Sequence, residues 1–158
     1  SAGMFIYNIY QPLAPVHVST YTHVFACDPV AVEGNYAYVT LRSGTPCNNS
    51  VNQLEVIDIE NLSAPSVIKT VPMSNPHGVG VENNTVYVCD RPEGLRVLDA
   101  SDVTRIDQAQ LAVFSAINAY DVIPYGQKLI MIADDGLYQY DCRNAQNIQL
   151  LSKISVAP

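Results

Sequence analysis

The chain has 158 residues, of which 48% are hydrophobic and 15% are charged, a balance that excludes a disordered chain and allows a domain with its own core. The net charge of −7, with only eight Lys and Arg, excludes the basic stripe by which proteins bind nucleic acid. The apolar runs are short and interrupted, so no transmembrane helix is predicted.

The first predicted strands are residues 5–9 and 16–21, on either side of the turn Leu-Ala-Pro. The same order of strand, turn and strand returns at residues 55–59 and 66–71, around Ser-Ala-Pro. A pattern that returns with its turn indicates an internal repeat, and residues 109–115 and 148–156 supply further strands of the second kind.

Between these segments lie three predicted hairpins, at residues 29–39, 78–88 and 121–132. Each has Gly or Asn in its turn, as hairpin turns require. After each hairpin comes a third strand that ends in Asp58, Asp99 or Asp141, and these residues are 41 and 42 positions apart. We expect the three carboxylates to accept hydrogen bonds from the turns that follow them, because positions one repeat apart cannot share a calcium ion.

Four strands in a repeat of about 42 residues predict an all-β fold, a β-propeller segment of four-stranded antiparallel blades. The prediction is one partial propeller domain over residues 1–158, with repeat units at about 16–59, 66–99 and 109–141. It contains three complete blades and a single terminal strand at each end. A β-sandwich is the alternative, but it would not repeat its turns at a constant period.

The segments Gly-Asn-Tyr-Ala-Tyr-Val (34–39), Leu-Glu-Val-Ile-Asp-Ile (54–59) and Ser-Ala-Pro (63–65) resemble the LVIVD repeat family. Residues 94–102 fit the same pattern, whereas Gln139 and Tyr140 stand where aliphatic residues are usual. The resemblance covers nearly the whole chain. It implies a propeller segment of an exported or cell-surface bacterial protein, and it implies no particular chemistry.

Three blades cannot close a ring, because closed propellers have about four to eight. A fragment would leave unpaired strand edges that invite pairing with other chains. Two hypotheses follow: a homodimer closes the ring, or the chain is part of a longer repeat protein.

The four cysteines form no zinc-binding pattern. Cys27 and Cys47 are predicted to lie in loops at the same end of one blade, where a disulfide would restrain the long loop 40–53. Two free thiols are the alternative. Cys89 and Cys142 are expected at opposite ends of the blades and therefore unpaired.

The only candidate site is a shallow polar funnel around His77, near the expected propeller axis. His77 matches Asp28 and Tyr120 in the repeat, and further polar residues follow the neighbouring strands. Such residues at the ends of strands more often cap strands and bond backbone groups. The candidate ligand-binding residues are Asp28, Arg42, His77, Asp90, Arg91, Tyr120, Asp121 and Asp134.

The predicted function is a non-catalytic binding or assembly scaffold for a protein, glycan or small ligand. No cofactor, metal ion or catalytic residue is assigned. The alternative is a propeller hydrolase or metal-dependent enzyme that uses His77 with Asp90 or Asp121.

Overall fold

The computed structural model describes residues 3–22, 29–44 and 50–156. The predictions for Cys27, Asp28 and Cys47 lie outside these residues. The described chain forms fourteen strands and one short 3-10 helix. In chain order these are β1 (Met4–Asn8), β2 (Val16–Tyr21), β3 (Val30–Glu33), β4 (Tyr36–Leu41), β5 (Gln53–Asp58), β6 (Ser66–Pro72), β7 (Pro76–Glu82), β8 (Thr85–Asp90), β9 (Gly94–Asp99), η1 (Val103–Gln108), β10 (Gln110–Phe114), β11 (Ala119–Tyr125), β12 (Lys128–Ala133), β13 (Gly136–Asp141) and β14 (Gln149–Ser155).

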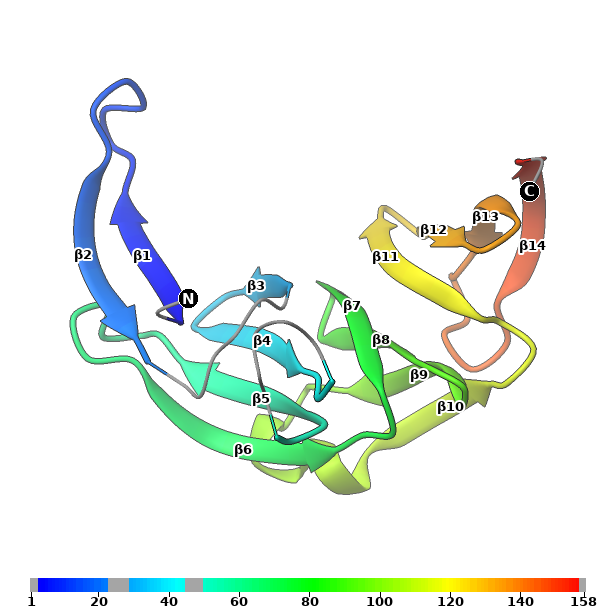
Figure 1. Ribbon diagram of the computed structural model, residues 1–158, viewed down its shortest axis with the longest axis horizontal. Coiled ribbons are helices and arrows are strands. Elements are labelled where there is room, and N and C mark those ends of the chain that lie inside the picture. Colours follow the sequence, from blue (N-terminus) through cyan, green and yellow to red (C-terminus); the bar gives the residue numbers. More distant parts are fainter. Residues whose placement is uncertain (1–2, 23–28, 45–49, 157–158) are drawn as a thin grey trace.

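Three four-stranded antiparallel sheets follow one another along the chain: β3–β6, β7–β10 and β11–β14. Strands β1 and β2 pair with each other as a half-blade in front of the first sheet. Figure 1 shows the four units side by side in an open arc, with β3, β7 and β11 on its inner side and β6 and β14 on its outer side. This arrangement confirms the predicted propeller segment.

The blade boundaries differ in one respect from the predicted units 16–59, 66–99 and 109–141. The predicted units begin with the segments 16–21, 66–71 and 109–115, but the corresponding strands β2, β6 and β10 are the last strands of their sheets. Consequently there is no single strand at each end. The N-terminal half-blade has two strands, and β14 completes the last sheet. A repeat period gives the length of a unit but not its starting point, which depends on the hydrogen-bonded pairing between strands.

Apolar side chains from adjacent sheets form the core between them. One cluster joins Val56 of β5 to Val86 and Val88 of β8, and a second joins Leu95 of β9 to Met131 of β12. A smaller third cluster lies between the half-blade and the first sheet. The first two four-stranded sheets each bury one side against the preceding unit and the other side against the following sheet, so burial extends along the arc as in other repeat proteins.

Two glutamates reach across to the turn of the next sheet. Glu33 Oε1 and Oε2 accept hydrogen bonds from the backbone N–H groups of Asn83 (2.7 Å) and Asn84 (2.8 Å). Glu82, the residue at the same place one sheet later, accepts from the N–H of Gly126 at 2.8 Å. We call this repeated contact the glutamate clasp. It ties consecutive sheets together at the end where their hairpin turns lie.

The aspartates that end the third strands bond the following turns as predicted. The Oδ1 atoms of Asp58, Asp99 and Asp141 accept from the backbone N–H two residues further on, at 2.8, 2.8 and 3.0 Å. The bonds are local to each sheet, so the carboxylates serve as turn anchors and not as ligands of a shared ion.

Candidate functional site

The loops that join one sheet to the next lie at the same end of the sheets as the links between the second and third strands. We call this end the loop face. Its described parts are residues 42–44, 50–52, 73–75, 91–93, 115–118 and 134–135. Strands alternate in direction within each sheet, which is why these two kinds of connection share one end.

His77 lies at the start of β7 and meets residues of both neighbouring sheets. Its Nε2 atom is 3.2 Å from Arg42 Nη1, and its ring contacts the Tyr120 ring edge-on, with centroids 5.5 Å apart. Its backbone carbonyl accepts a hydrogen bond from Thr40 Oγ1 at 2.6 Å. The structure therefore brings together Arg42, His77 and Tyr120, one from each sheet.

The Arg42 contact determines the state of His77. A guanidinium can only donate hydrogen bonds, so Nε2 of His77 must accept and the imidazole is neutral. Burial lowers the pKa of His77 below its ordinary value, and the positive charges of Arg42 and Arg91 lower it further. Asp90 opposes this shift and is the weakest of the four influences.

Arg91 continues the polar contacts to the third sheet. Its guanidinium lies over the Tyr120 ring, 4.0 Å from the centroid. Nε donates to Asn118 Oδ1 at 2.6 Å, and Nη2 donates to Asp134 Oδ2 at 2.7 Å. Hydrogen bonding by Tyr120 and the charge of Arg91 hold the pKa of Asp134 below its ordinary value. Asn118 was not among the predicted residues, and only the cross-sheet geometry reveals it.

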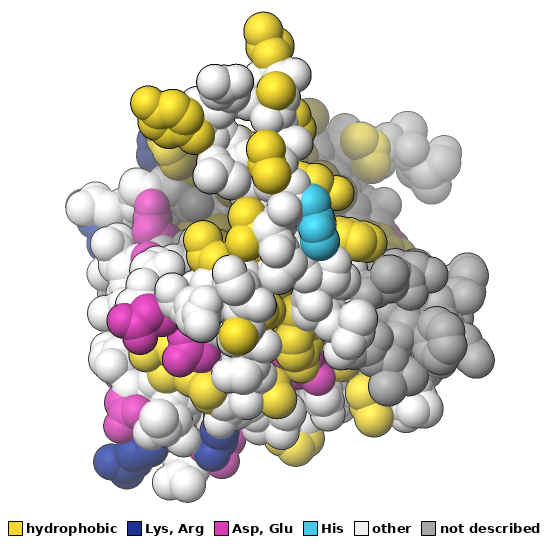
Figure 2. Space-filling view, turned by 90° about the vertical axis from the view of Figure 1, so that its left-hand side faces the viewer, with side chains coloured by type: hydrophobic (Ala, Val, Ile, Leu, Met, Phe, Trp, Pro, Cys, Tyr) yellow, Lys and Arg dark blue, Asp and Glu magenta, His cyan; other side chains and the backbone are white. Residues whose placement is uncertain are grey.

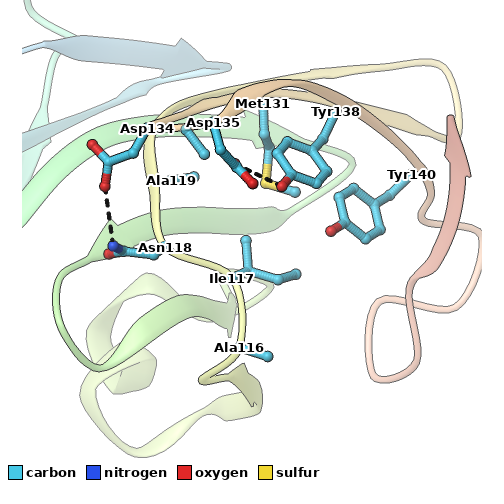
Figure 3. Close-up of a pocket in the computed structure, with 10 residues that line it drawn as sticks. Ala116, Ile117, Asn118, Ala119, Met131, Asp134, Asp135, Tyr138 and Tyr140 are labelled. Atoms are coloured by element: carbon cyan, nitrogen blue, oxygen red, sulfur yellow. Dashed lines mark hydrogen bonds between the residues drawn. The ribbon is translucent and has the colours of Figure 1, made fainter. Parts of the chain in front are cut away.

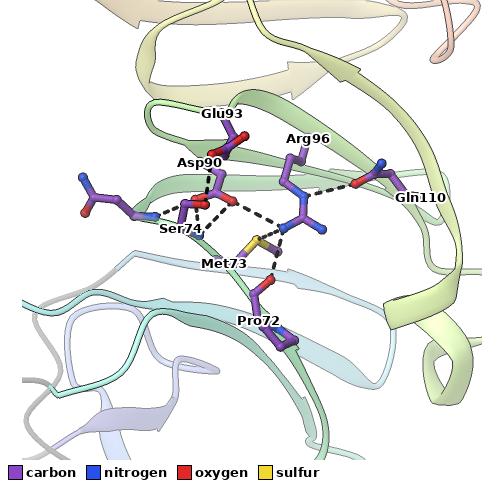
Figure 4. Close-up of polar contacts among 8 residues, drawn as sticks. Pro72, Met73, Ser74, Asp90, Glu93, Arg96 and Gln110 are labelled. Carbon is purple, nitrogen blue, oxygen red and sulfur yellow. Dashed lines mark hydrogen bonds and ion pairs between the residues drawn. The ribbon is translucent and has the colours of Figure 1, made fainter.

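Asp90 does not line the surface, because its side chain is completely buried. It accepts hydrogen bonds from the backbone N–H groups of Ser74 (2.9 Å) and Asn75 (2.7 Å), and an ion pair at 3.3 Å joins it to Arg96 (Figure 4). The prediction that Asp90 lines the funnel is wrong. The physical reason is that its carboxylate turns inward to accept the backbone N–H groups of the loop. Asp90 fixes the link between β6 and β7 from within.

Asp121 is exposed and bonds its own backbone surroundings. Its Oδ1 accepts from the N–H of Val122 at 2.9 Å. Among the described residues, neither Asp90 nor Asp121 makes a hydrogen bond to the His77 ring. The pairings on which the enzymatic alternative depends are therefore not formed in this structure.

Beside Asp134 and Asn118, the loop face is hollowed by a pocket of about 230 Å³ (Figure 3). The rings of Tyr138 and Tyr140 stack in it, with centroids 6.1 Å apart and planes 18° apart. Tyr138 donates from its hydroxyl to Asp135 Oδ1 at 2.7 Å. The lining residues are Ala116, Ile117, Asn118, Ala119, Met131, Ala133, Asp134, Asp135, Tyr138 and Tyr140.

The two tyrosines were missed by the site prediction. Tyr140 departs from the aliphatic pattern of the repeat, and that departure is the signal in the sequence that could have pointed to this position. The pocket is smaller than the roughly 300–1,000 Å³ typical of drug-sized ligands, so it admits a group the size of one ring.

Comparison with known proteins identifies the repeat. The model of the LVIVD repeat matches residues 26–72 and 75–107, just over half of the chain. The chain belongs to the LVIVD repeat family. The first LVIVD match ends at residue 72, where β6 and the first sheet end, so the family unit and the hydrogen-bonded sheet coincide there.

Among solved structures, this LVIVD chain is similar to the N-terminal domain of Nup159, with 20% identity and a TM-score of 0.48. A chain in the S. cerevisiae complex of Dbp5 with Nup159, Gle1, IP6 and ADP gives 20% identity and a TM-score of 0.49. In both cases 80% of this chain is covered, and it spans 30% of the other chain. The comparison with curated proteins found no match.

Among the described residues, no group of three or more His, Cys, Asp or Glu side chains is placed to hold a metal ion. Within residues 3–22, 29–44 and 50–156, no helix is long and apolar enough to cross a membrane. The polar residues of the loop face are paired with one another, and the stacked tyrosines offer a ring surface beside them.

Proposed function

We propose that the protein is a non-catalytic binding scaffold and that its ligand, part of a protein, a glycan or a small molecule, inserts one ring-sized group into the Tyr138–Tyr140 pocket. The observation that carries the proposal is the stacked tyrosine pair beside fixed polar groups. Aromatic faces with a few well-placed polar atoms are typical of ligand sites. Arg91 and Asn118 hold the Asp134 side chain in place at the rim of the pocket. Ligand binding therefore does not have to restrict the motion of this side chain.

The test is a thermal-shift screen of glycans and small ring compounds, followed by calorimetry on any ligand found. A ligand that binds the native state raises the melting temperature. Tyr138→Ala and Tyr140→Ala are expected to weaken binding at least tenfold. Tyr125→Ala is the matched control, because Tyr125 is an exposed tyrosine outside the pocket. Equal binding by all three variants would refute the proposed site.

The enzymatic alternative has its own test. A hydrolase or metal-dependent enzyme using His77 would lose turnover in His77→Gln with its fold intact, whereas a scaffold has no turnover to lose. Substitution of Asp90 cannot serve this purpose, because its buried carboxylate holds the loop before β7. A purely structural spacer predicts that no ligand shifts the melting temperature.

We also propose an exported or cell-surface location, which membership of the LVIVD family supports. Fractionation of the native cells with an antibody to the protein tests it, and recovery in the cytoplasm alone would refute it. The sequence leaves two proposals for the open ring: a homodimer closes it, or the chain is part of a longer repeat protein. Light scattering over a wide range of concentration tests the homodimer, and a monomer throughout contradicts it.

A further inference from the structure

The first two four-stranded sheets each turn one side toward the sheet that follows in the chain. We call this side the forward face, and we use the same name for the equivalent side of the last sheet, β11–β14. Positions on the forward face repeat from sheet to sheet. Thr40, Cys89 and Ile132 share one such position on the second strand, and Leu54, Leu95 and Leu137 share its partner on the third strand.

In the first two sheets the forward face is covered. Thr40, Leu54, Cys89 and Leu95 are all fully buried, each pair beneath the following sheet. The covering residues are aliphatic, such as Val86 and Val88 of β8 over the first sheet and Leu129 and Met131 of β12 over the second.

In the last sheet the same positions are open. Ile132 is 52% exposed and Leu137 is 38% exposed, although both lie in the middle strands of a four-stranded sheet. Ile123 on β11 and Ile154 on β14 extend the apolar surface across all four strands, at 55% and 64% exposed. A contiguous apolar surface of this kind marks an interaction site.

We propose that the forward face of β11–β14 binds a further four-stranded LVIVD blade, which covers it with its own aliphatic side. The argument is continuity with the two interfaces already present. Both earlier copies of this face are buried by such a blade, and the exposed residues are the equivalents of those buried ones.

A second copy of this chain fits the face less well. The opposite sides of its three four-stranded sheets are each covered by the preceding unit. Among the described residues, only the half-blade leaves this opposite side open, and it carries Phe5 and Tyr7, each in ring contact with His17. Figure 2 views that end of the molecule. Two strands cover only half of a four-stranded face.

The face also specifies how the covering blade must differ from the blades seen here. Ile123 stands where the earlier sheets have Ala31 and Gly80, so the innermost strand of the new blade needs a small residue or more distance. Tyr125 stands where Glu33 and Glu82 make the clasp, so this contact rests on apolar packing without the clasp.

The test adds a blade to the protein. A copy of residues 73–114, the second sheet with its preceding link, is fused after Val156, which reproduces a four-residue connection like residues 115–118. The variant I132C reports coverage, since a cysteine already occupies the equivalent buried position as Cys89. Burial raises the pKa of Cys89 to about 12, so that thiol is an internal standard for a covered position.

Alkylation of the I132C thiol, followed by peptide mass mapping, is expected to slow at least tenfold in the fusion. The matched control carries lysine at the fused copies of Val86 and Val88, and it should restore the unfused rate. A second fusion, with a copy of residues 115–156, guards against failure of one added blade to fold. Equal rates with and without either added blade would refute the proposal. The proposal would also be refuted if, in the unfused protein, alkylation of the I132C thiol slows as the protein concentration rises. That result would identify a second copy of the chain as the occupant of the face.

Discussion

A single buried carboxylate organises the loop between the first and second sheets. Asp90 accepts two backbone N–H groups of the loop and also pairs with Arg96 (Figure 4). Arg96 in turn donates to the backbone carbonyl of Pro72 at 3.1 Å, at the end of β6. A charge buried in this way is stable only while its hydrogen bonds are complete.

Asp90→Asn should therefore lower the free energy of unfolding by about 1–3 kcal/mol, because an amide nitrogen replaces one accepting oxygen against two donors. The measurement is urea unfolding followed by circular dichroism. Asp134→Asn is the control, since the ion pair of this solvent-exposed carboxylate with Arg91 should contribute little to the free energy of unfolding. Equal losses in the two variants would contradict the assigned role of Asp90.

Also at the scale of single residues, the pKa of His77 should lie below its ordinary value. Burial and the charges of Arg42 and Arg91 lower its native pKa, whereas in the unfolded chain it is about 6.5. Between these two values the unfolded state binds more protons, so His77 makes stability fall as the pH drops through about 6.5. At higher pH the imidazole is neutral in both states and contributes no pH dependence. The NMR midpoint of the His77 ring tests this, and a midpoint above 6.5 would show that the sign is wrong.

At the scale of elements, β7 and β11 of adjacent sheets approach each other closely at Gly78. A Cβ atom on Gly78 would lie 2.2 Å from Asp121 Oδ1, 2.5 Å from Asp121 Cα and 2.8 Å from the Tyr120 carbonyl oxygen. The conflict involves backbone atoms, so a side-chain rotation cannot relieve it. A glycine inside a strand thus reflects the close approach of another backbone.

Gly78→Ala is expected to cost about 1–3 kcal/mol, as overpacking does in other cores. Gly34→Ala is the comparison, because a Cβ there would meet nothing within 4 Å. Its positive φ of 58° should cost only about 1 kcal/mol. Chemical denaturation of both variants provides the measurement, and a larger loss for Gly34→Ala would rule out the close approach as the cause.

The sequence predicted the strands well and their grouping into sheets less well. Every hairpin and third strand lies where the alternating aliphatics and the Gly or Asn turns predicted it, because those patterns are local. The starting point of the blade depends on which neighbour each outer strand pairs with, and a constant period does not contain this information. The helix η1 was not predicted, and its buried Val103 and Ile106 lie in the core cluster that the first and second sheets share.

The candidate site was predicted in part for the same reason. Matching positions in the repeat placed Arg42, His77 and Tyr120 together correctly, because equivalent residues of adjacent blades lie side by side. The burial of Asp90 and the contribution of Asn118 could not be predicted, since both depend on loop conformations. The stacking of Tyr138 on Tyr140 follows from their spacing of two along β13, which puts both rings on one side of the sheet.

At the scale of the whole molecule, stability should vary along the arc. The sheet β7–β10 is covered on both sides, whereas the half-blade and β11–β14 each have one free side. In repeat proteins, stability is approximately the sum of each unit and its contacts with neighbours. We therefore expect amide hydrogen exchange to be slowest in β8 and β9 and fastest in β1, β2 and β14.

Hydrogen exchange measured by mass spectrometry resolves these segments, and uniform protection along the chain would contradict the expectation. The fused blade described above supplies a control. Covering the last sheet should slow exchange in β12 and β13 and leave β1 and β2 unchanged, because the added contact is distant from the half-blade.

The glutamate clasp has a consequence for how such chains can change over evolutionary time. In the described part of the chain, the hydrogen bonds of Glu33 and Glu82 come from main-chain N–H groups, so the contact depends on the backbone shape of the receiving turn and not on its side chains. The Asn83-Asn84 turn makes this contact through two N–H groups, and the Gly126-Gln127 turn makes it through one. Units carrying such turns are thus interchangeable at this joint, and duplication or reordering of blades leaves it intact.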